Sequence, residues 1–120
     1  MARTALTVYP IASAGLADPA ATTGIVDGHT VANSGGNVFL EFNNSVASPR
    51  TITIQTTAQV GEYNVEDKTI VIPASAQRFK TRYFEPSLFN YPAGVTDAGM
   101  FYLDYPVGQH ADITVRAFSL

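Results

Sequence analysis

Few side chains in this sequence could carry out chemistry. It has two histidines, ten acidic residues and no cysteine, which excludes thiolate nucleophiles, disulfides and cysteine-ligated metals. His29 follows Asp27-Gly28 and His110 follows Gly108-Gln109, which are turn sequences, and neither histidine lies in an H-x-H or H-E-x-x-H arrangement. We therefore predict structural or surface roles for both histidines, and no metal site.

No other catalytic or cofactor motif is recognisable. The serines lack the G-x-S-x-G elbow of a hydrolase nucleophile, and Gly35-Gly36 belongs neither to a Walker loop nor to a dinucleotide-binding motif. The acidic loop of residues 62–67 lacks the D-x-[DN]-x-[DN]-G spacing of a calcium site. We predict a protein that is not an enzyme and holds no cofactor. The enzymatic alternative would need His29 and His110 to converge with a carboxylate.

Three cations recur at a spacing of two residues: Arg78, Lys80 and Arg82. This period places all three on one face of a predicted strand. One interpretation is a solvated edge strand whose charges discourage unwanted pairing. The other is a docking face for an acidic protein surface. Nucleic acid is a poor partner for this chain, because its net charge is −3 and phosphate binding needs clustered Lys and Arg in excess.

Aromatic residues gather in the C-terminal half of the chain. They are Tyr83, Phe84, Phe89, Tyr91, Phe101, Tyr102 and Tyr105. A small sandwich has room in its core for about half of them, so we expect the others to lie in a subunit interface, where Tyr and Phe are enriched. Exposed aromatic rings also serve as platforms for sugars, which keeps a carbohydrate-binding module open as an alternative.

Alternating apolar and polar residues recur in short blocks bounded by Gly, Pro, Asn, Asp or Ser, which is typical of strands with one buried face. The predicted strands cover residues 5–10, 24–31, 37–43, 50–57, 70–72, 78–83, 100–105 and 113–117, with one helical turn at 86–90. The polar stretch 43–49 is interpreted as a hairpin connection between the strands on either side of it.

Seven or eight short strands without crossover helices predict an all-β domain, an antiparallel β-sandwich of the jelly-roll or immunoglobulin-like type. The Ala, Gly and Thr content of residues 1–23 predicts an extended N-terminal arm. Residues 24–120 are predicted to form the sandwich domain. No apolar run approaches the ~20 residues of a membrane span, so we expect no membrane partner. Only 14% of the residues are charged, and such a surface resists association weakly.

Several motifs follow one another along residues 24–120. They are Asp27-Gly28-His29-Thr30, GGNVFLEFNN at 35–44, ITIQT at 52–56, VIPA at 71–74, FEPSLFN at 84–90 and YLDY at 102–105. This succession resembles small virion proteins encoded among the head and tail genes of tailed bacteriophages, particularly those of actinobacterial hosts.

The resemblance implies a structural protein of the virus particle, and among these we favour a capsid decoration protein. Proteins of that kind bind the outside of the shell, commonly as homotrimers, and cement neighbouring major capsid protein subunits. The expected partners are therefore the major capsid protein and further copies of this chain. A head–tail connector, tail tube or head-fibre component of the same virion is the near alternative.

In such a protein we expect residues 1–16 to form an arm or an added strand on a neighbouring subunit. The predicted partner-binding residues in the arm are Arg3, Leu6, Val8 and Tyr9. In the sandwich domain they are Arg78, Lys80, Arg82, Tyr83, Phe84, Phe89 and Tyr91.

Overall fold

The computed structural model describes residues 3–11, 15–17, 19–57, 59–60, 62–92, 94 and 97–120. Over these residues the chain forms twelve short strands, one helical turn and one 3₁₀ turn at His110–Asp112. The other bounds are β1 (Thr4–Ala5), β2 (Val8–Pro10), β3 (Thr22–Thr23), β4 (His29–Ala32), β5 (Val38–Asn44), β6 (Arg50–Ile54), β7 (Gln59–Val60), β8 (Tyr63–Asn64), β9 (Lys68–Ile72), β10 (Phe79–Lys80), α1 (Pro86–Phe89), β11 (Met100–Asp104) and β12 (Ile113–Ser119).

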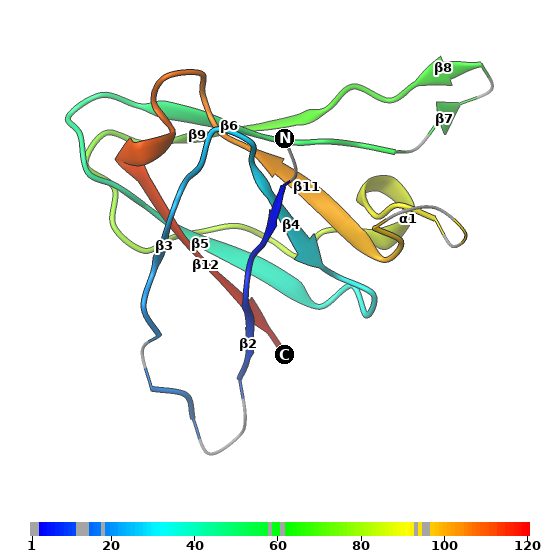
Figure 1. Ribbon diagram of the computed structural model, residues 1–120, viewed down its shortest axis with the longest axis horizontal. Coiled ribbons are helices and arrows are strands. Elements are labelled where there is room, and N and C mark those ends of the chain that lie inside the picture. Colours follow the sequence, from blue (N-terminus) through cyan, green and yellow to red (C-terminus); the bar gives the residue numbers. More distant parts are fainter. Residues whose placement is uncertain are drawn as a thin grey trace.

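The strands build two five-stranded sheets (Figure 1). The first sheet has the order β1-β4-β11-β6-β9, and the second has the order β10-β5-β12-β2, with β3 also paired to β12. Strands β7 and β8 form a separate hairpin between β6 and β9. The all-β sandwich predicted by the alternating pattern is therefore confirmed.

Eight of the strands form four antiparallel pairs that are nested along the chain. The innermost pair is β6 with β9, and outside it follow β5 with β10, β4 with β11, and β3 with β12. Successive pairs alternate between the two sheets, and the pairs β5–β12 and β6–β11 complete each sheet. A long hairpin rolled up in this way is a jelly roll. This strand order decides between the two sandwich types that the sequence pattern leaves open.

The connection over residues 43–49 is not a hairpin, which corrects the sequence interpretation. It leaves β5 in one sheet and enters β6 in the other. The core-facing residues of the two strands therefore meet across the sandwich instead of lying side by side. A period of two identifies which face of a strand is buried, but it does not identify the neighbouring strand.

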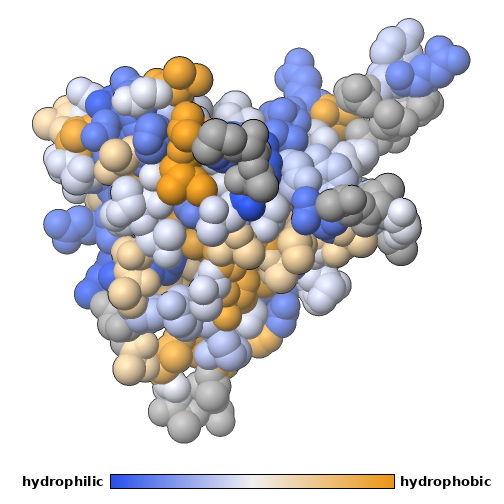
Figure 2. Space-filling model, in the orientation of Figure 1, coloured by the Kyte–Doolittle hydropathy of each residue, from blue (hydrophilic) through white to orange (hydrophobic). Residues whose placement is uncertain are grey.

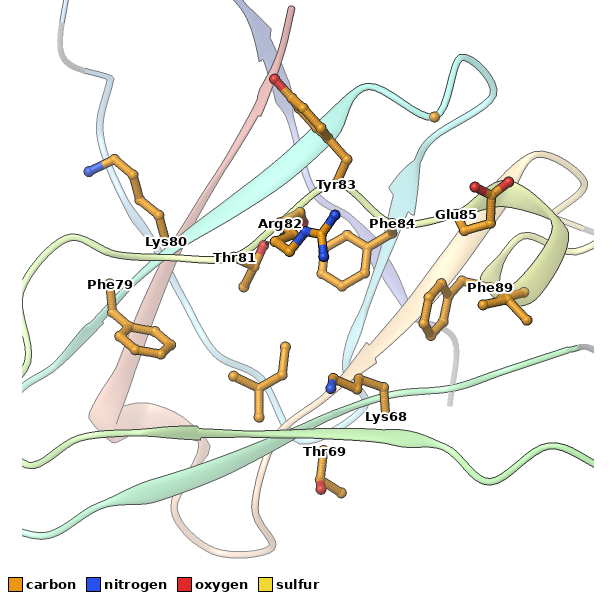
Figure 3. A pocket seen from close by; sticks show the side chains of 13 residues that line it. Lys68, Thr69, Phe79, Lys80, Thr81, Arg82, Tyr83, Phe84, Glu85 and Phe89 are labelled. Carbon is orange, nitrogen blue, oxygen red and sulfur yellow. Dashed lines mark hydrogen bonds between the residues drawn. The ribbon is translucent and has the colours of Figure 1, made fainter.

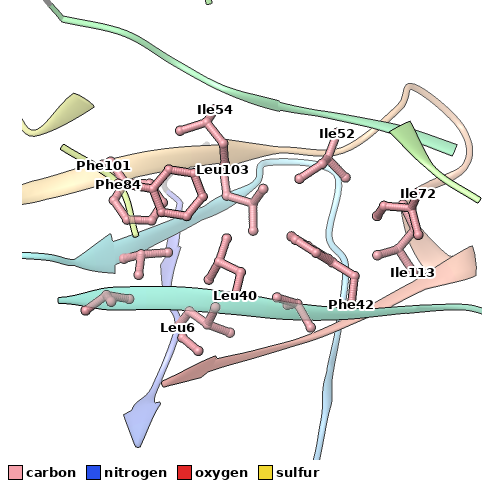
Figure 4. Close-up of a cluster of buried hydrophobic side chains, with 14 residues drawn as sticks. Leu6, Leu40, Phe42, Ile52, Ile54, Ile72, Phe84, Phe101, Leu103 and Ile113 are labelled. Atoms are coloured by element: carbon pink, nitrogen blue, oxygen red, sulfur yellow. The ribbon is translucent and has the colours of Figure 1, made fainter. Parts of the chain in front are cut away.

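The core lies between the sheets and uses the positions that the alternation predicts. From β5, Leu40 and Phe42 face Ile52, Ile54 and Leu103 of the other sheet (Figure 4), and all five are fully buried. The remaining core residues are Leu6, Val31, Val38, Ile72, Phe84, Phe101, Ile113, Val115 and Ala117.

The N-terminal segment, residues 3–11, closes one side of this sandwich. β1 pairs in parallel with β4 at the edge of the first sheet, and β2 pairs in parallel with β12 at the edge of the second. Between them Leu6 enters the core, with 6% of its surface exposed. The sheets are thus mixed where a purely antiparallel sandwich was predicted, because these two strands are parallel.

The opposite side of the sandwich is bordered by β9 and β10, the last strands of their sheets. β10 is only two residues long and is followed by irregular chain that leads into α1. Because no described strands cover this side as β1 and β2 cover the other, the space between the sheets opens there into a cleft.

Candidate functional site

The cleft between β9 and β10 has a volume of about 650 Å³ and brings together five of the residues predicted from the sequence to bind a partner. These are Lys80, Arg82, Tyr83, Phe84 and Phe89. Its apolar wall is completed by Phe79 (Figure 3) and by Ile70. Lys68 lines the cleft from β9, so cations border it on both sides.

Local backbone geometry explains the short strand beside the cleft. Arg78 has a left-handed φ of 55°, and its N–H donates a 2.7 Å hydrogen bond to the Asn43 side chain. Pairing with β5 extends one residue past β10, because the Leu40 N–H donates to Thr81 Oγ1 at 3.0 Å and the Thr81 N–H donates to the Leu40 carbonyl at 2.9 Å. Phe84 then turns into the core.

This geometry corrects the prediction that Arg78, Lys80 and Arg82 share one strand face. A residue at positive φ interrupts the extended backbone on which alternation depends. Arg78 instead lines a separate hollow of about 340 Å³ with Asp112 and other polar residues. Only Lys80 and Arg82 of the three border the cleft.

The charges at the cleft are only partly balanced, because Lys68, Lys80 and Arg82 line it together with one carboxylate, that of Glu85. Lys80 forms a 3.2 Å ion pair with Glu41, whose other oxygen receives a 2.9 Å hydrogen bond from Arg116. In the strand register Glu41 lies directly opposite Lys80 of β10 and Arg116 of β12. These two cations explain how the buried Glu41 carboxylate is stabilised. Lys68 and Arg82 form no ion pair with any residue in the described parts of the chain.

The aromatic residues divide between the core and the surface, as the limited interior predicts. Phe84 packs against Phe101 at 4.7 Å between ring centroids and against Phe89 at 5.6 Å. Tyr83 is 48% exposed at the cleft. Tyr91 lies outside the cleft, in contact with the Tyr102 ring at 4.5 Å.

Two aromatic residues that sequence reasoning missed extend the surface beyond Tyr83. Phe39 makes an edge contact with Tyr83 at 5.9 Å and stacks on Phe118 at 5.5 Å, and Phe118 pairs with Tyr9 in the strand register. Phe39 and Phe118 occupy outward positions of β5 and β12, where the alternation calls for polar residues. These two departures from the alternation were the signal in the sequence that could have identified Phe39 and Phe118 as surface aromatic residues.

The predicted binding residues of the N-terminal arm lie away from the cleft. Arg3 pairs with Asp104 at 2.5 Å and lies 4.2 Å from the centre of the Tyr102 ring. Leu6 belongs to the core and Val8 packs against it. In the single chain the segment thus adds its strands to its own two sheets, where we expected it to add to a neighbour. Residues 1, 2, 12–14 and 18 of the predicted arm lie outside the described residues.

The two histidines occupy separate structural positions. His29 is buried, and its Nδ1 lies 2.6 Å from the Tyr105 hydroxyl. Burial lowers the pKa of His29 and raises that of Tyr105, so this hydrogen bond joins a neutral imidazole and a protonated phenol. His110 lies in the 3₁₀ turn, and its Nδ1 is buried without a hydrogen-bond partner in the described chain. In the described chain no three His, Asp or Glu side chains are grouped to hold a metal ion.

Comparisons with known proteins identify no relative of this chain. The chain matches no family model, no curated protein and no solved structure. Within the described residues, no helix has the length and apolar character needed to cross a membrane.

Proposed function

We propose that this chain is a virion structural protein, specifically a capsid decoration protein that binds the outer surface of the major capsid protein shell and stabilises it. The observation that carries the proposal is the cleft, whose apolar wall lies beside two cations without an ion pair in the described chain. Such a site suits a protein segment, because apolar burial provides affinity and carboxylates on the partner neutralise the cations.

The edge strands on either side of the cleft favour the same kind of partner. Among the described residues, β9 pairs on one side only, with β6, and β10 pairs on one side only, with β5. The free edge of a strand offers backbone N–H and C=O groups to an added segment of another chain. A partner could therefore be held by its backbone as well as by its side chains.

The fold and the sequence motifs support the particle assignment in different ways. A jelly roll is a frequent scaffold of viral capsid domains, but it also serves lectins and cupins, so the fold by itself does not assign a function. The succession of motifs from Asp27 to Tyr105 supports the phage virion. The low fraction of charged residues, 14%, suits a surface covered by neighbouring subunits.

The proposal is tested by cosedimentation with expanded, empty shells of the major capsid protein encoded in the same genome. We expect the wild-type chain to saturate the shells. Lys68→Gln with Arg82→Gln should bind at least ~10-fold more weakly, because about 1.4 kcal/mol of lost charge pairing gives that factor.

The matched control is Thr51→Glu with Ala111→Glu, which changes the net charge by the same amount at exposed positions outside the cleft. It should bind shells like the wild type. Absence of wild-type binding to shells would overturn the decoration role. Binding to purified tails instead would favour the connector or tail component.

A further inference from the structure

We propose that the cleft of one molecule binds the β7–β8 hairpin of a second copy of this chain, so that copies associate head to tail. This inference deepens the proposed function, on which it rests for the premise that the cleft docks a protein segment. It identifies the protein segment in the cleft as the hairpin of a neighbouring copy, so that the cleft contributes to shell binding by linking copies on the shell.

The hairpin projects from the body of the molecule. It extends beyond β6 and β9 and stands clear of the two sheets (Figure 1), and the residues coloured on it are mainly hydrophilic (Figure 2). Glu62, Glu66 and Asp67 are all exposed there, and the Tyr63 side chain is 79% exposed. A short two-stranded hairpin is marginally stable in isolation, so this one gains from being covered.

The acidic groups of the hairpin are largely unused within their own molecule. Asp67 accepts a 3.0 Å hydrogen bond from the Thr56 N–H at the base of the hairpin. Glu62 and Glu66 form no ion pair with any residue in the described chain. The hairpin thus presents two free carboxylates beside an exposed aromatic ring.

The cleft offers the complementary groups. Lys68 and Arg82 provide two cations without an ion-pair partner in the described chain, and Ile70, Phe79 and Phe89 provide apolar surface for a ring. Its volume of about 650 Å³ lies within the range of ~300–1,000 Å³ typical of sites that enclose a small group. Insertion of Tyr63 would bury its ring against the apolar wall of the cleft, and Glu62 and Glu66 would pair with the two cations.

A second copy is the occupant because the hairpin leads away from the cleft of its own chain. Lys68 is both the first residue of β9, at the base of the hairpin, and part of the cleft lining. The projecting hairpin and the cleft are different surfaces, and a heterologous contact between them, when repeated, produces a closed ring or an open chain of molecules.

The test is the mass of the full chain in solution without shells, measured by light scattering and sedimentation equilibrium over rising protein concentration. We expect wild-type mass above the monomer at low salt and weaker association at high salt, because screening reduces exposed charge pairs. Lys68→Glu with Arg82→Glu should weaken association at least ~10-fold, and Glu62→Lys with Glu66→Lys should do the same.

The decisive variant combines all four substitutions in one chain. It exchanges the charges of the cleft and the hairpin, so association should return towards the wild-type level. Tyr63→Ser, an exposed change outside the core, should weaken association without lowering the melting temperature. The inference is overturned by a monomeric wild type, by a fourfold variant no better than either pair, or by an ineffective Tyr63→Ser.

The two proposals can fail separately. If the chain associates in a charge-dependent way but does not bind shells, the hairpin contact is supported and the decoration role is overturned. Shell binding by a chain that stays monomeric in solution and on the shell would keep the decoration role and overturn the hairpin contact.

Discussion

Gly28 lies where the N-terminal segment meets β11. Its φ is +76°, and a Cβ atom there would come within 2.5 Å of the Leu103 carbonyl oxygen and 2.4 Å of Arg3 Nη1. A side chain at this position would therefore strain its own backbone and displace the Arg3–Asp104 ion pair.

We expect Gly28→Ala to lower the free energy of unfolding by about 3 kcal/mol, measured by urea denaturation. Gly108→Ala is the matched control, since Gly108 has nearly the same φ of +75° but no atom within 4 Å of the added Cβ. It should cost only about 1 kcal/mol, the backbone penalty alone. Equal losses in the two variants would show that the close approach at Gly28 is unimportant.

The His29–Tyr105 pair predicts a loss of stability in acid. Burial lowers the pKa of His29 in the folded chain below its ordinary value of 6.5. Between those two pKa values the unfolded chain binds more protons than the folded chain, so the free energy of unfolding decreases as the pH falls below about 6.5. The measurement is urea denaturation at a series of pH values from 7 to 5.

His29→Gln should be less stable overall but should lose this part of the pH dependence. His110→Gln leaves the His29–Tyr105 pair intact, so its free energy of unfolding should keep the pH dependence of the wild type. The interpretation fails if the stability of His29→Gln falls with pH as steeply as that of the wild type.

At the scale of the elements, the N-terminal segment is held by one buried side chain and two very short parallel strands. Leu6 is 6% exposed and lies between β1 and β2, which cover the edges of both sheets. We expect Leu6→Ala to lower the free energy of unfolding by about 2–5 kcal/mol, the usual cost of truncating a buried leucine. Thermal and urea denaturation measure it.

Leu16→Ala is the control, because Leu16 is 41% exposed and outside the core. Its effect should stay within about 0.5 kcal/mol. If Leu6→Ala is equally mild, the segment does not depend on Leu6 for its attachment.

The nested strand pairs of the whole molecule predict an order of folding. Pairing β6 with β9 closes a loop of residues 55–67, whereas pairing β3 with β12 closes a loop of residues 24–112. The longer loop costs about 2 kcal/mol more in chain entropy. We therefore expect the innermost pair to be better formed in the folding transition state.

Ile54 and Ile113 allow a matched comparison, since both are fully buried and lie in the innermost and outermost pairs. Folding and unfolding rates of Ile54→Val and Ile113→Val should give the larger φ-value at Ile54. A larger value at Ile113 would mean that folding begins with the long-range pair.

Residue patterns in the sequence were sufficient for the fold class and for most of the core. Val38, Leu40 and Phe42 alternate with outward residues, and each is buried as expected. The same reasoning selected Lys80, Arg82 and Tyr83 for the site, because clustered cations and aromatic rings are uncommon in a chain with so little charge. It could not foresee Arg78 at positive φ, since a left-handed residue within a strand pattern carries no consistent signal in a single sequence.

By itself, then, the sequence determined the strands, the faces they bury and the supply of charged and aromatic groups, because these depend on neighbours along the chain. Only the tertiary structure decided which strands pair, that the N-terminal segment closes one side, and that Lys68 on β9 meets Arg82 across a cleft. Such contacts join residues distant in sequence, and many pairings satisfy the same period-two pattern. The packing of both sheets against one shared core selects among them.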